Sequence, residues 1–142
     1  MTEHAHCFAL TERYIRCIRA KGWCDLIHIK NDAGEIRISS KVISAVAGGA
    51  VVECYGVKGM AMRSDIDGLV HLLRRESVSK GVKVVFNEDK TVSLDLHIMV
   101  ENGVNMLAIA PSIINGVRYV VNKTTGAEVR DVNIFIDSLV IG

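Results

Sequence analysis

The clearest alternation of hydrophobic and polar positions lies in the second half of the chain. Residues 82–86 and 92–100 are hydrophobic at every second position, and a polar turn at 88–90 separates them. Because successive side chains of a strand point to opposite faces of a sheet, this pattern predicts a β-hairpin with one buried face. The same alternation at 129–136 predicts a final strand.

A second, shorter hairpin is predicted near the amino terminus. Ile27 and Ile29 alternate before a turn at 31–34, and Ile36 and Ile38 alternate after it. The strand at 35–39 leads into a helix that Ser39 or Ser40 can cap. The predicted core side of this helix consists of Val42 or Ile43, Val46, Ala47, Ala50 and Cys54.

Gly48 and Gly49 lie inside that helix. Each glycine costs about 1 kcal/mol relative to alanine in a helix interior. We therefore expect the sheet to approach the helix backbone closely at this point.

Three further helices are predicted from apolar residues at helical spacing. A short basic amphipathic helix covers 11–21, a second helix covers 65–75, and the last helix runs to Lys123 and stops at Gly126. Because proline is best tolerated in the first helical turn, we expect the last helix to begin at Pro111, with a separate turn at 104–110.

These elements define the expected architecture, a single α+β domain in the order β-α-α-β-β-α-β. It has a small, mainly antiparallel sheet with the helices packed on one face. Residues 1–33 form an amino-terminal extension with a short amphipathic helix and a strand, and residues 34–142 form the main domain.

Composition narrows the function classes. The chain has 142 residues, a formal net charge of +1 and 49% hydrophobic residues, so it has no global attraction for nucleic acid or anionic membranes. The four cysteines are irregularly spaced, as is typical of reduced cytoplasmic thiols. The longest apolar stretch, 42–52, is too short to cross a bilayer.

Candidate catalytic and metal-ligating residues are few. His4, His6 and Cys7 form the densest group of metal-capable side chains, but they have no fourth ligand and lie at the chain end. Asp95 and His97 share one strand face at a spacing of about 7 Å, outside hydrogen-bond reach, so we expect a solvated surface there. The sequence contains no nucleotide-binding motif. We therefore predict a non-enzymatic protein without a cofactor or metal.

Four segments together resemble a known family. They read GEIRISSKVISAVAGGAVVECYGVKGM, SKGVKV, VSLDLHIMVENGV and TTGAEVRDVNIFIDSLVI. In order and spacing, they resemble the alkaline shock protein family of Gram-positive bacteria, and the resemblance covers about residues 34–141. It implies a small cytoplasmic protein without known enzymatic activity, linked to cell-envelope or general stress. Such proteins self-associate, and in some members a separate anchor protein holds them at the membrane.

The chain departs from this family pattern in two places. Leu107 and Ala108 stand where family members usually have a Pro-Glu pair that opens the last helix. The first thirty residues have no counterpart in the family, so the resemblance implies nothing about them.

The segment Gly56-Val57-Lys58-Gly59 has two interpretations. A Gly-x-x-Gly between two helices is the clamp with which KH domains hold a nucleic-acid backbone, and Arg63 would add to its positive charge. Alternatively, Gly56 ends a helix in a left-handed conformation and Gly59 helps a loop turn. The apolar residues at 60–62 favour the second interpretation. Nucleic-acid binding remains the alternative function.

Surplus apolar positions predict a self-association surface. On the last helix, Ile113, Val117 and Val120 form a core stripe, and Leu107, Ile114 and Val121 form a second stripe beside it. On the outer sheet face, apolar side chains stand where polar ones are expected. The amino-terminal extension could cover one of these surfaces within the chain. The predicted contact residues between subunits are Ile114, Val121 and Phe135, with Val85 and Met99.

Overall fold

The computed structural model describes residues 26–63, 70–72 and 75–141. The predicted helix at 11–21 and the group His4, His6 and Cys7 lie outside these residues. The elements in chain order are β1 (Leu26–Asn31), β2 (Gly34–Ser39), α2 (Ser40–Val52), β3 (Val57–Arg63), β4 (Val70–Leu72), the 3-10 helix η1 (Arg75–Gly81), β5 (Val82–Phe86), β6 (Val92–Glu101), α3 (Met106–Thr125) and β7 (Val129–Val140).

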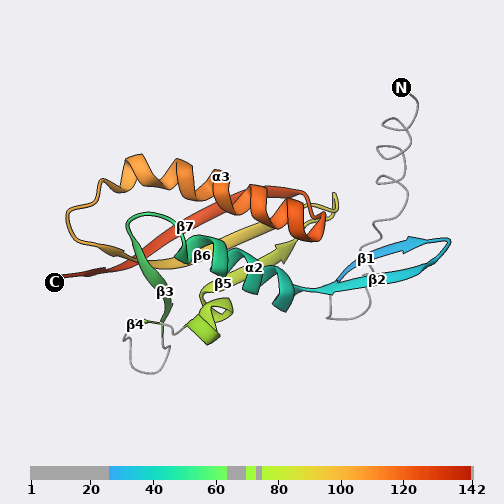
Figure 1. Ribbon diagram of the computed structural model, residues 1–142, viewed down its shortest axis with the longest axis horizontal. Coiled ribbons are helices and arrows are strands. Elements are labelled where there is room, and N and C mark those ends of the chain that lie inside the picture. The colour runs from blue at the N-terminus through green and yellow to red at the C-terminus, as the bar shows by residue number, and fades with distance from the viewer. Residues whose placement is uncertain (1–25, 64–69, 73–74, 142) are drawn as a thin grey trace.

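Strand β6 is the centre of the main sheet (Figure 1). Antiparallel β5 pairs with residues 92–96 of β6, and antiparallel β3 pairs with residues 98–100. Strand β7 pairs in parallel along the whole of β6, so it occupies one edge while β5 and β3 share the other. The crossover between the parallel strands β6 and β7 is α3. The α+β class and the mainly antiparallel sheet are thus confirmed.

The hydrophobic core lies between one face of β6 and the two long helices. The five inward residues of β6, from Val92 to Val100, are 0–1% exposed. Burying one such aliphatic side chain contributes roughly 1.5–3 kcal/mol. The helix residues that pack against them are Ile43, Ala47, Val51, Ile113, Val117 and Val121. Both helices therefore lie on the same face, as the alternation predicts.

The β1–β2 hairpin is a separate two-stranded sheet that projects from one end of the molecule (Figure 1). Its antiparallel register pairs Ile27 with Ile38 and Ile29 with Ile36, which confirms the predicted hairpin. Ile27 is buried but Ile36 is 52% exposed, so the apolar face is only partly covered.

The predicted second helix at 65–75 is wrong where the structure describes that segment. Residues 70–72 form β4, which pairs with residues 61–63 of β3, so two strands stand where the predicted order had a loop and a helix. Met60 and Ala61 are fully buried in β3. The apolar spacing of this segment fits either a helix or a strand, and burial and strand pairing determine that it is a strand.

Helix α2 begins as predicted, but its packing differs in part. Of the predicted core side, Ile43 and Ala47 are buried, and the fully buried Val51 was not predicted. The partly buried residues are Val46, Ala50 and Cys54. Ser39 is the N-cap residue, although its side chain makes no capping bond. A Cβ added to Gly48 would lie 3.1 Å from Val78, whereas Gly49 faces open space. The close approach is therefore confirmed at Gly48 only, and its neighbour is η1 rather than the sheet.

Helix α3 begins at Met106, so the predicted start at Pro111 is wrong. Asn105 caps the helix, because its side-chain Oδ1 accepts from the N–H of Ala108 at 3.4 Å. Pro111 lacks the N–H that would bond the carbonyl of Leu107. Leu107 is 88% exposed, so water can satisfy that carbonyl. At the other end, Gly126 closes the helix at φ +72°, as predicted.

Candidate interaction surface

A β-bulge on the outer face of the sheet brings together His97, Phe135 and Asp137. His97 of β6 stands opposite Phe135 of β7, and the register shifts just beyond Ile136, so Asp137 is the extra residue of the bulge. The Oδ2 atom of Asp137 lies 3.0 Å from Nδ1 of His97. The imidazole stacks on the Phe135 ring with centroids 5.0 Å apart. The exposed Phe135 ring is therefore stacked on an imidazole that Asp137 orients.

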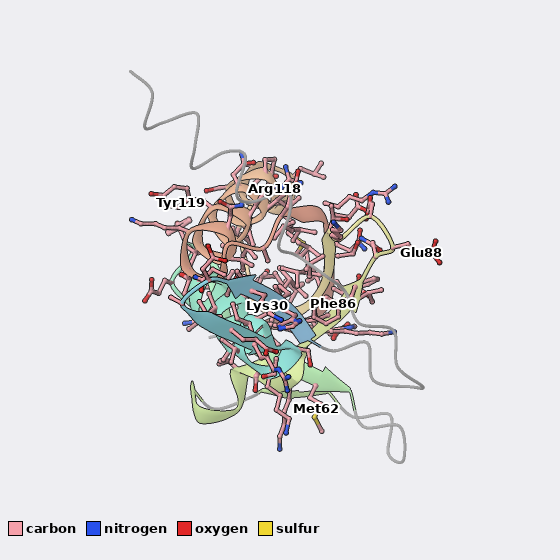
Figure 2. All side chains as sticks on the ribbon, turned by 90° about the vertical axis from the view of Figure 1, so that its right-hand side faces the viewer. Lys30, Met62, Phe86, Glu88, Arg118 and Tyr119 are labelled. Atoms are coloured by element: carbon pink, nitrogen blue, oxygen red, sulfur yellow. The ribbon has the colours of Figure 1, made fainter. Side chains whose placement is uncertain are left out.

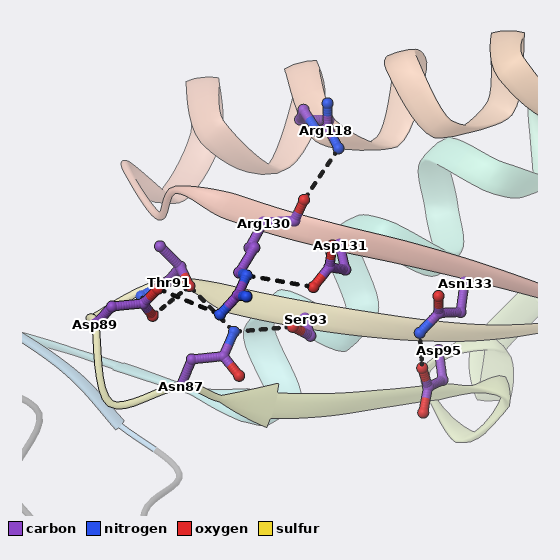
Figure 3. A network of polar contacts seen from close by, with 9 residues as sticks. All are labelled: Asn87, Asp89, Thr91, Ser93, Asp95, Arg118, Arg130, Asp131 and Asn133. Carbon is purple, nitrogen blue, oxygen red and sulfur yellow. Dashed lines mark hydrogen bonds and ion pairs between the residues drawn. The ribbon is translucent and has the colours of Figure 1, made fainter.

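Asp95 has its own partner on this face. The side-chain amide of Asn133 donates to Oδ1 of Asp95 at 2.8 Å (Figure 3). Asp95 and His97 therefore bond to different residues of β7, in agreement with the predicted lack of an acid–base pair. Among the described residues, no hydroxyl or thiol bonds the second ring nitrogen of His97. The carboxylate of Asp137 therefore orients the imidazole ring.

A polar network fixes the β5–β6 turn to the start of β7 (Figure 3). The hydroxyl of Thr91 donates to Asp89 at 2.6 Å, and this bond holds the pKa of the Asp89 carboxyl below its ordinary value. Arg130 reaches Asp89 at 3.4 Å and Asp131 at 3.6 Å. From α3, Arg118 donates to the carbonyl of Arg130 at 3.1 Å. The beginning of β7 is thereby tied to both the turn and the helix.

An open groove of about 440 Å³ runs beside α3. Tyr119 is 63% exposed there, and the ammonium of Lys123 lies 5.5 Å from its ring centroid. Figure 2 shows Tyr119 on the outer side of α3, whereas Figure 3 shows Arg118 pointing from α3 toward Arg130 of β7. The groove lacks the apolar walls that usually enclose a small ligand. Its lining residues are Asn115, Arg118, Tyr119, Asn122, Glu128 and Val129.

The predicted self-association residues fall into two groups. Phe135 and Val85 are 45% and 41% exposed on the outer sheet face, so they are available to a partner. Ile114 is half-buried against the core.

Val121 is fully buried and Met99 is 9% exposed, so neither is a surface contact in this chain. Val121 is buried because the inward stripe of α3 runs through Ile113, Val117 and Val121, at a spacing of four residues, rather than through Val120. Met99 lies in β6 where β3 pairs with it, opposite Gly59.

The Gly-x-x-Gly segment does not join two helices. Helix α2 ends at Val52, so Gly56, with φ +83°, lies in the turn before β3 and is not the helix terminator. Gly59 lies within β3 opposite Met99 rather than in a loop. The ammonium of Lys58 lies 3.6 Å from Glu101. Arg63 is the last residue of β3.

Two features explain why this position takes glycine. The φ of Gly56 is positive, and an added Cβ would lie 2.9 Å from the side chain of Val104. The helix–loop–helix geometry that a KH clamp needs is thus absent from residues 40–63. The structural premise of the nucleic-acid alternative is wrong.

The sequence analysis did not identify Asp137 as a site residue, although the alternation of hydrophobic and polar positions in β7 indicates a bulge there. Asp137 and Ser138 are two consecutive polar residues that interrupt the apolar alternation of β7. Such an interruption in an alternating strand is the usual mark of a bulge. A bulge re-aims a side chain, here toward a residue 40 positions earlier in the chain.

Metal binding and membrane spanning have no structural support in the part of the chain that the structure describes. No group of three or more His, Cys, Asp or Glu side chains there could hold a metal ion. No helix there is long and apolar enough to span a bilayer.

Comparison with known proteins places the chain in a family. Residues 28–141 match the model of the alkaline shock protein 23 family, which has a cell envelope-related function. The chain is 40% identical over 114 residues to the uncharacterized protein YloU of Bacillus subtilis (strain 168), covering 80% of this chain and 94% of that protein. It is 32% identical over 114 residues to the uncharacterized protein Spy1614 of Streptococcus pyogenes, covering 80% and 93%. No solved structure matches.

The chain therefore belongs to the alkaline shock protein family, which confirms the resemblance of its four sequence segments.

Proposed function

We propose that this member of the alkaline shock protein family is a non-enzymatic interaction protein of the cytoplasm that supports the cell envelope under stress. It self-associates and docks to a membrane-anchored partner protein. The family has a cell envelope-related function, and its relatives compared above are uncharacterized proteins.

The observation that carries the proposal is the exposed ring of Phe135. It is 45% exposed, stacks on His97, and is flanked by the bulge residue Asp137 that binds His97. A large aromatic side chain whose orientation is already fixed loses little conformational entropy on binding. Aromatic residues of this kind are enriched among the residues that contribute most to protein–protein affinity.

Light scattering coupled to size-exclusion chromatography, run over a concentration series, tests self-association. We expect the wild-type chain to exceed the monomer mass and Phe135→Asp to shift the mass toward the monomer. Tyr119→Asp is the matched control, since Tyr119 is also an exposed aromatic residue but lies on α3. Circular dichroism establishes that both variants are folded.

Cell fractionation tests the membrane-anchored partner. We expect a share of the wild-type chain in the membrane fraction, and a smaller share of Phe135→Asp than of Tyr119→Asp. A wild-type chain that is monomeric at every concentration and absent from the membrane fraction contradicts the proposed function.

A further inference from the structure

One edge of β7 is open to another strand. Among the described residues only β6 pairs with β7, so the N–H and C=O groups along the second edge of this 12-residue strand have no strand partner. An unpaired strand edge is a ready template for a further strand, and natural proteins usually protect it with bulges, charges or a covering segment. The protection of β7 is uneven.

The two ends of this edge differ in how they are closed. Near the start of β7, its pairing with β6 shifts by one residue between Val129 and Asp131. The side chain of Arg118 donates a hydrogen bond to the carbonyl of Arg130 there. A second shift follows Ile136. Between these bulges, the stretch from Asp131 to Ile136 is regular strand without proline or glycine. A partner strand would pair along this stretch and reach the bulge residue Asp137 at its end.

The side chains of this stretch leave apolar surface uncovered on both sides of the sheet. Phe135 is 45% exposed on the outer face, and Ile136, which faces the helix side, is 38% exposed. Leu139, beyond the second bulge, is 46% exposed. A strand added at this edge would cover apolar side chains on both faces at once, which a ligand lying on one face could not do.

Side-chain complementarity favours a second copy of the same strand as the occupant. An antiparallel two-fold pair centred on Phe135 places the two Phe135 rings together and Ile134 beside Ile136 of the second copy. It also brings the amide of Asn133 toward the carboxylate of Asp137. Aromatic pairs, aliphatic pairs and amide–carboxylate contacts all stabilise cross-strand neighbours.

Neighbouring registers are less favourable. Centring the pair on Ile134 places Asp131 beside Asp137 of the second copy, and like charges directly opposite each other are destabilising. Centring it on Asn133 places Phe135 beside a carboxylate, that of Asp131. A two-fold axis between two residues is excluded. It would place each residue opposite its sequence neighbour in the second copy, but opposite side chains share a face of the sheet and sequence neighbours point to different faces.

We propose that two copies of this chain join edge to edge through antiparallel β7 strands about a two-fold axis at Phe135, so that their sheets become continuous. This inference rests on the proposed self-association and specifies its geometry. The axis is perpendicular to the sheet, so the helices of both copies lie on the same side. The interface is isologous, as in most homodimers.

Disulfide formation between introduced cysteines tests the pairing in the full-length chain. Phe135→Cys places the two new thiols at the axis, where opposite Cβ atoms are about 4.5–5.5 Å apart, close to disulfide geometry. Val85→Cys is the matched control, because Val85 is similarly exposed on the same face but belongs to β5. Under mild oxidation we expect Phe135→Cys to form the dimer on the order of a hundredfold faster than Val85→Cys. Mass spectrometry distinguishes this linkage from those of the four native cysteines.

A second pair of variants keeps the Phe135 ring intact. Asn133→Cys and Asp137→Cys are prepared separately, oxidised alone and then oxidised as a mixture. The proposed register predicts a disulfide between the two different variants, formed mainly in the mixture.

The outcomes separate this inference from the proposed function. If light scattering shows an oligomer but neither the Phe135→Cys linkage nor the mixed linkage forms faster than that of Val85→Cys, edge pairing is wrong and self-association stands. If the wild-type chain is monomeric at every concentration, self-association itself is wrong. An oligomer that links equally at Val85→Cys and Phe135→Cys also rejects the two-fold edge pair.

Discussion

The two faces of β6 carry different information about the protein. On the inner face, five aliphatic side chains are 0–1% exposed beneath α2 and α3. On the outer face, Ser93, Asp95 and His97 are half-buried, and each has a polar partner contributed by another strand or turn. The same ten-residue strand thus supplies the core on one side and a set of specific contacts on the other.

This difference separates the face that determines stability from the face that carries the proposed contact surface. The inner face depends on burial, which is non-directional and tolerates many apolar sequences of the right volume. The outer face depends on hydrogen-bond geometry, and a bulge in β7 determines which side chains meet. Substitutions on the inner face should therefore change the free energy of unfolding strongly, whereas outer-face substitutions should change it weakly and alter binding.

The largest expected effect is on the inner face. Leu96→Ala should lower the free energy of unfolding by about 2–5 kcal/mol, because Leu96 is fully buried and the cavity is only partly refilled. Its neighbour Asp95 makes one surface hydrogen bond, so Asp95→Ala should cost about 1 kcal/mol. Urea unfolding measures both values. Equal losses would show that the two faces do not differ in this way.

A double-mutant cycle sharpens the comparison on the outer face. His97→Ala, Asp137→Ala and the double variant should give a coupling of about 0.5–1.5 kcal/mol, since the two side chains are hydrogen-bonded and partly buried. The control cycle replaces Asp95 and His97, which bond to different residues, and its coupling should be near zero. Coupling that is larger in the control cycle would contradict the bulge geometry.

The smallest effect concerns pH at the β5–β6 turn. The hydrogen bond from Thr91 lowers the pKa of Asp89 in the folded protein, so the ionised carboxylate stabilises the fold. This contribution is fully present above the ordinary pKa of an aspartate and is lost as the pH falls through the lower, folded value. The stability difference between wild type and Asp89→Asn should therefore shrink in acid, by a small amount because Asp89 is exposed.

Thr91→Val provides the control for this pH effect. It removes the hydroxyl that donates to Asp89 and should reduce the acid-dependent difference. Thermal melts between neutral pH and acid measure this difference. They compare the wild type, Asp89→Asn, Thr91→Val and the variant with both substitutions. If Asp89→Asn has the same acid-dependent effect on stability with and without Thr91→Val, another carboxyl group causes the pH effect.

The sequence predicted the inner face well because strand alternation and burial are local and periodic. The β5–β6 hairpin, the β1–β2 hairpin and the cap at Gly126 all follow from patterns within twenty residues. The segment at 65–75 failed because its apolar spacing fits more than one element, and pairing with the buried β3 decides the outcome. The prediction from Pro111 failed because the solvent-exposed side of a helix tolerates one missing hydrogen bond in the second turn.

The candidate surface was only partly predictable. The exposure of Phe135 and Val85 was predictable, because both are apolar residues that break the alternation of the outer face. Val121 was misassigned, since two adjacent helical stripes are equally apolar and only the crossing of α3 over the sheet decides which one is inward. The meeting of His97 with Asp137 depends on a register shift between distant strands, which no local pattern specifies.

The central position of β6 also shapes the motions of the fold. Among the described strands, β3, β5 and β7 all bond to β6, so no hydrogen bond of β6 can open unless one of these neighbours moves away. Local fraying at the ends of β5 or β3 leaves the long pairing with β7 intact. Amide protons that β6 donates to β7 should consequently exchange with solvent only through global unfolding, and so report the full stability of the domain, whereas those of the projecting β1–β2 hairpin exchange through smaller openings.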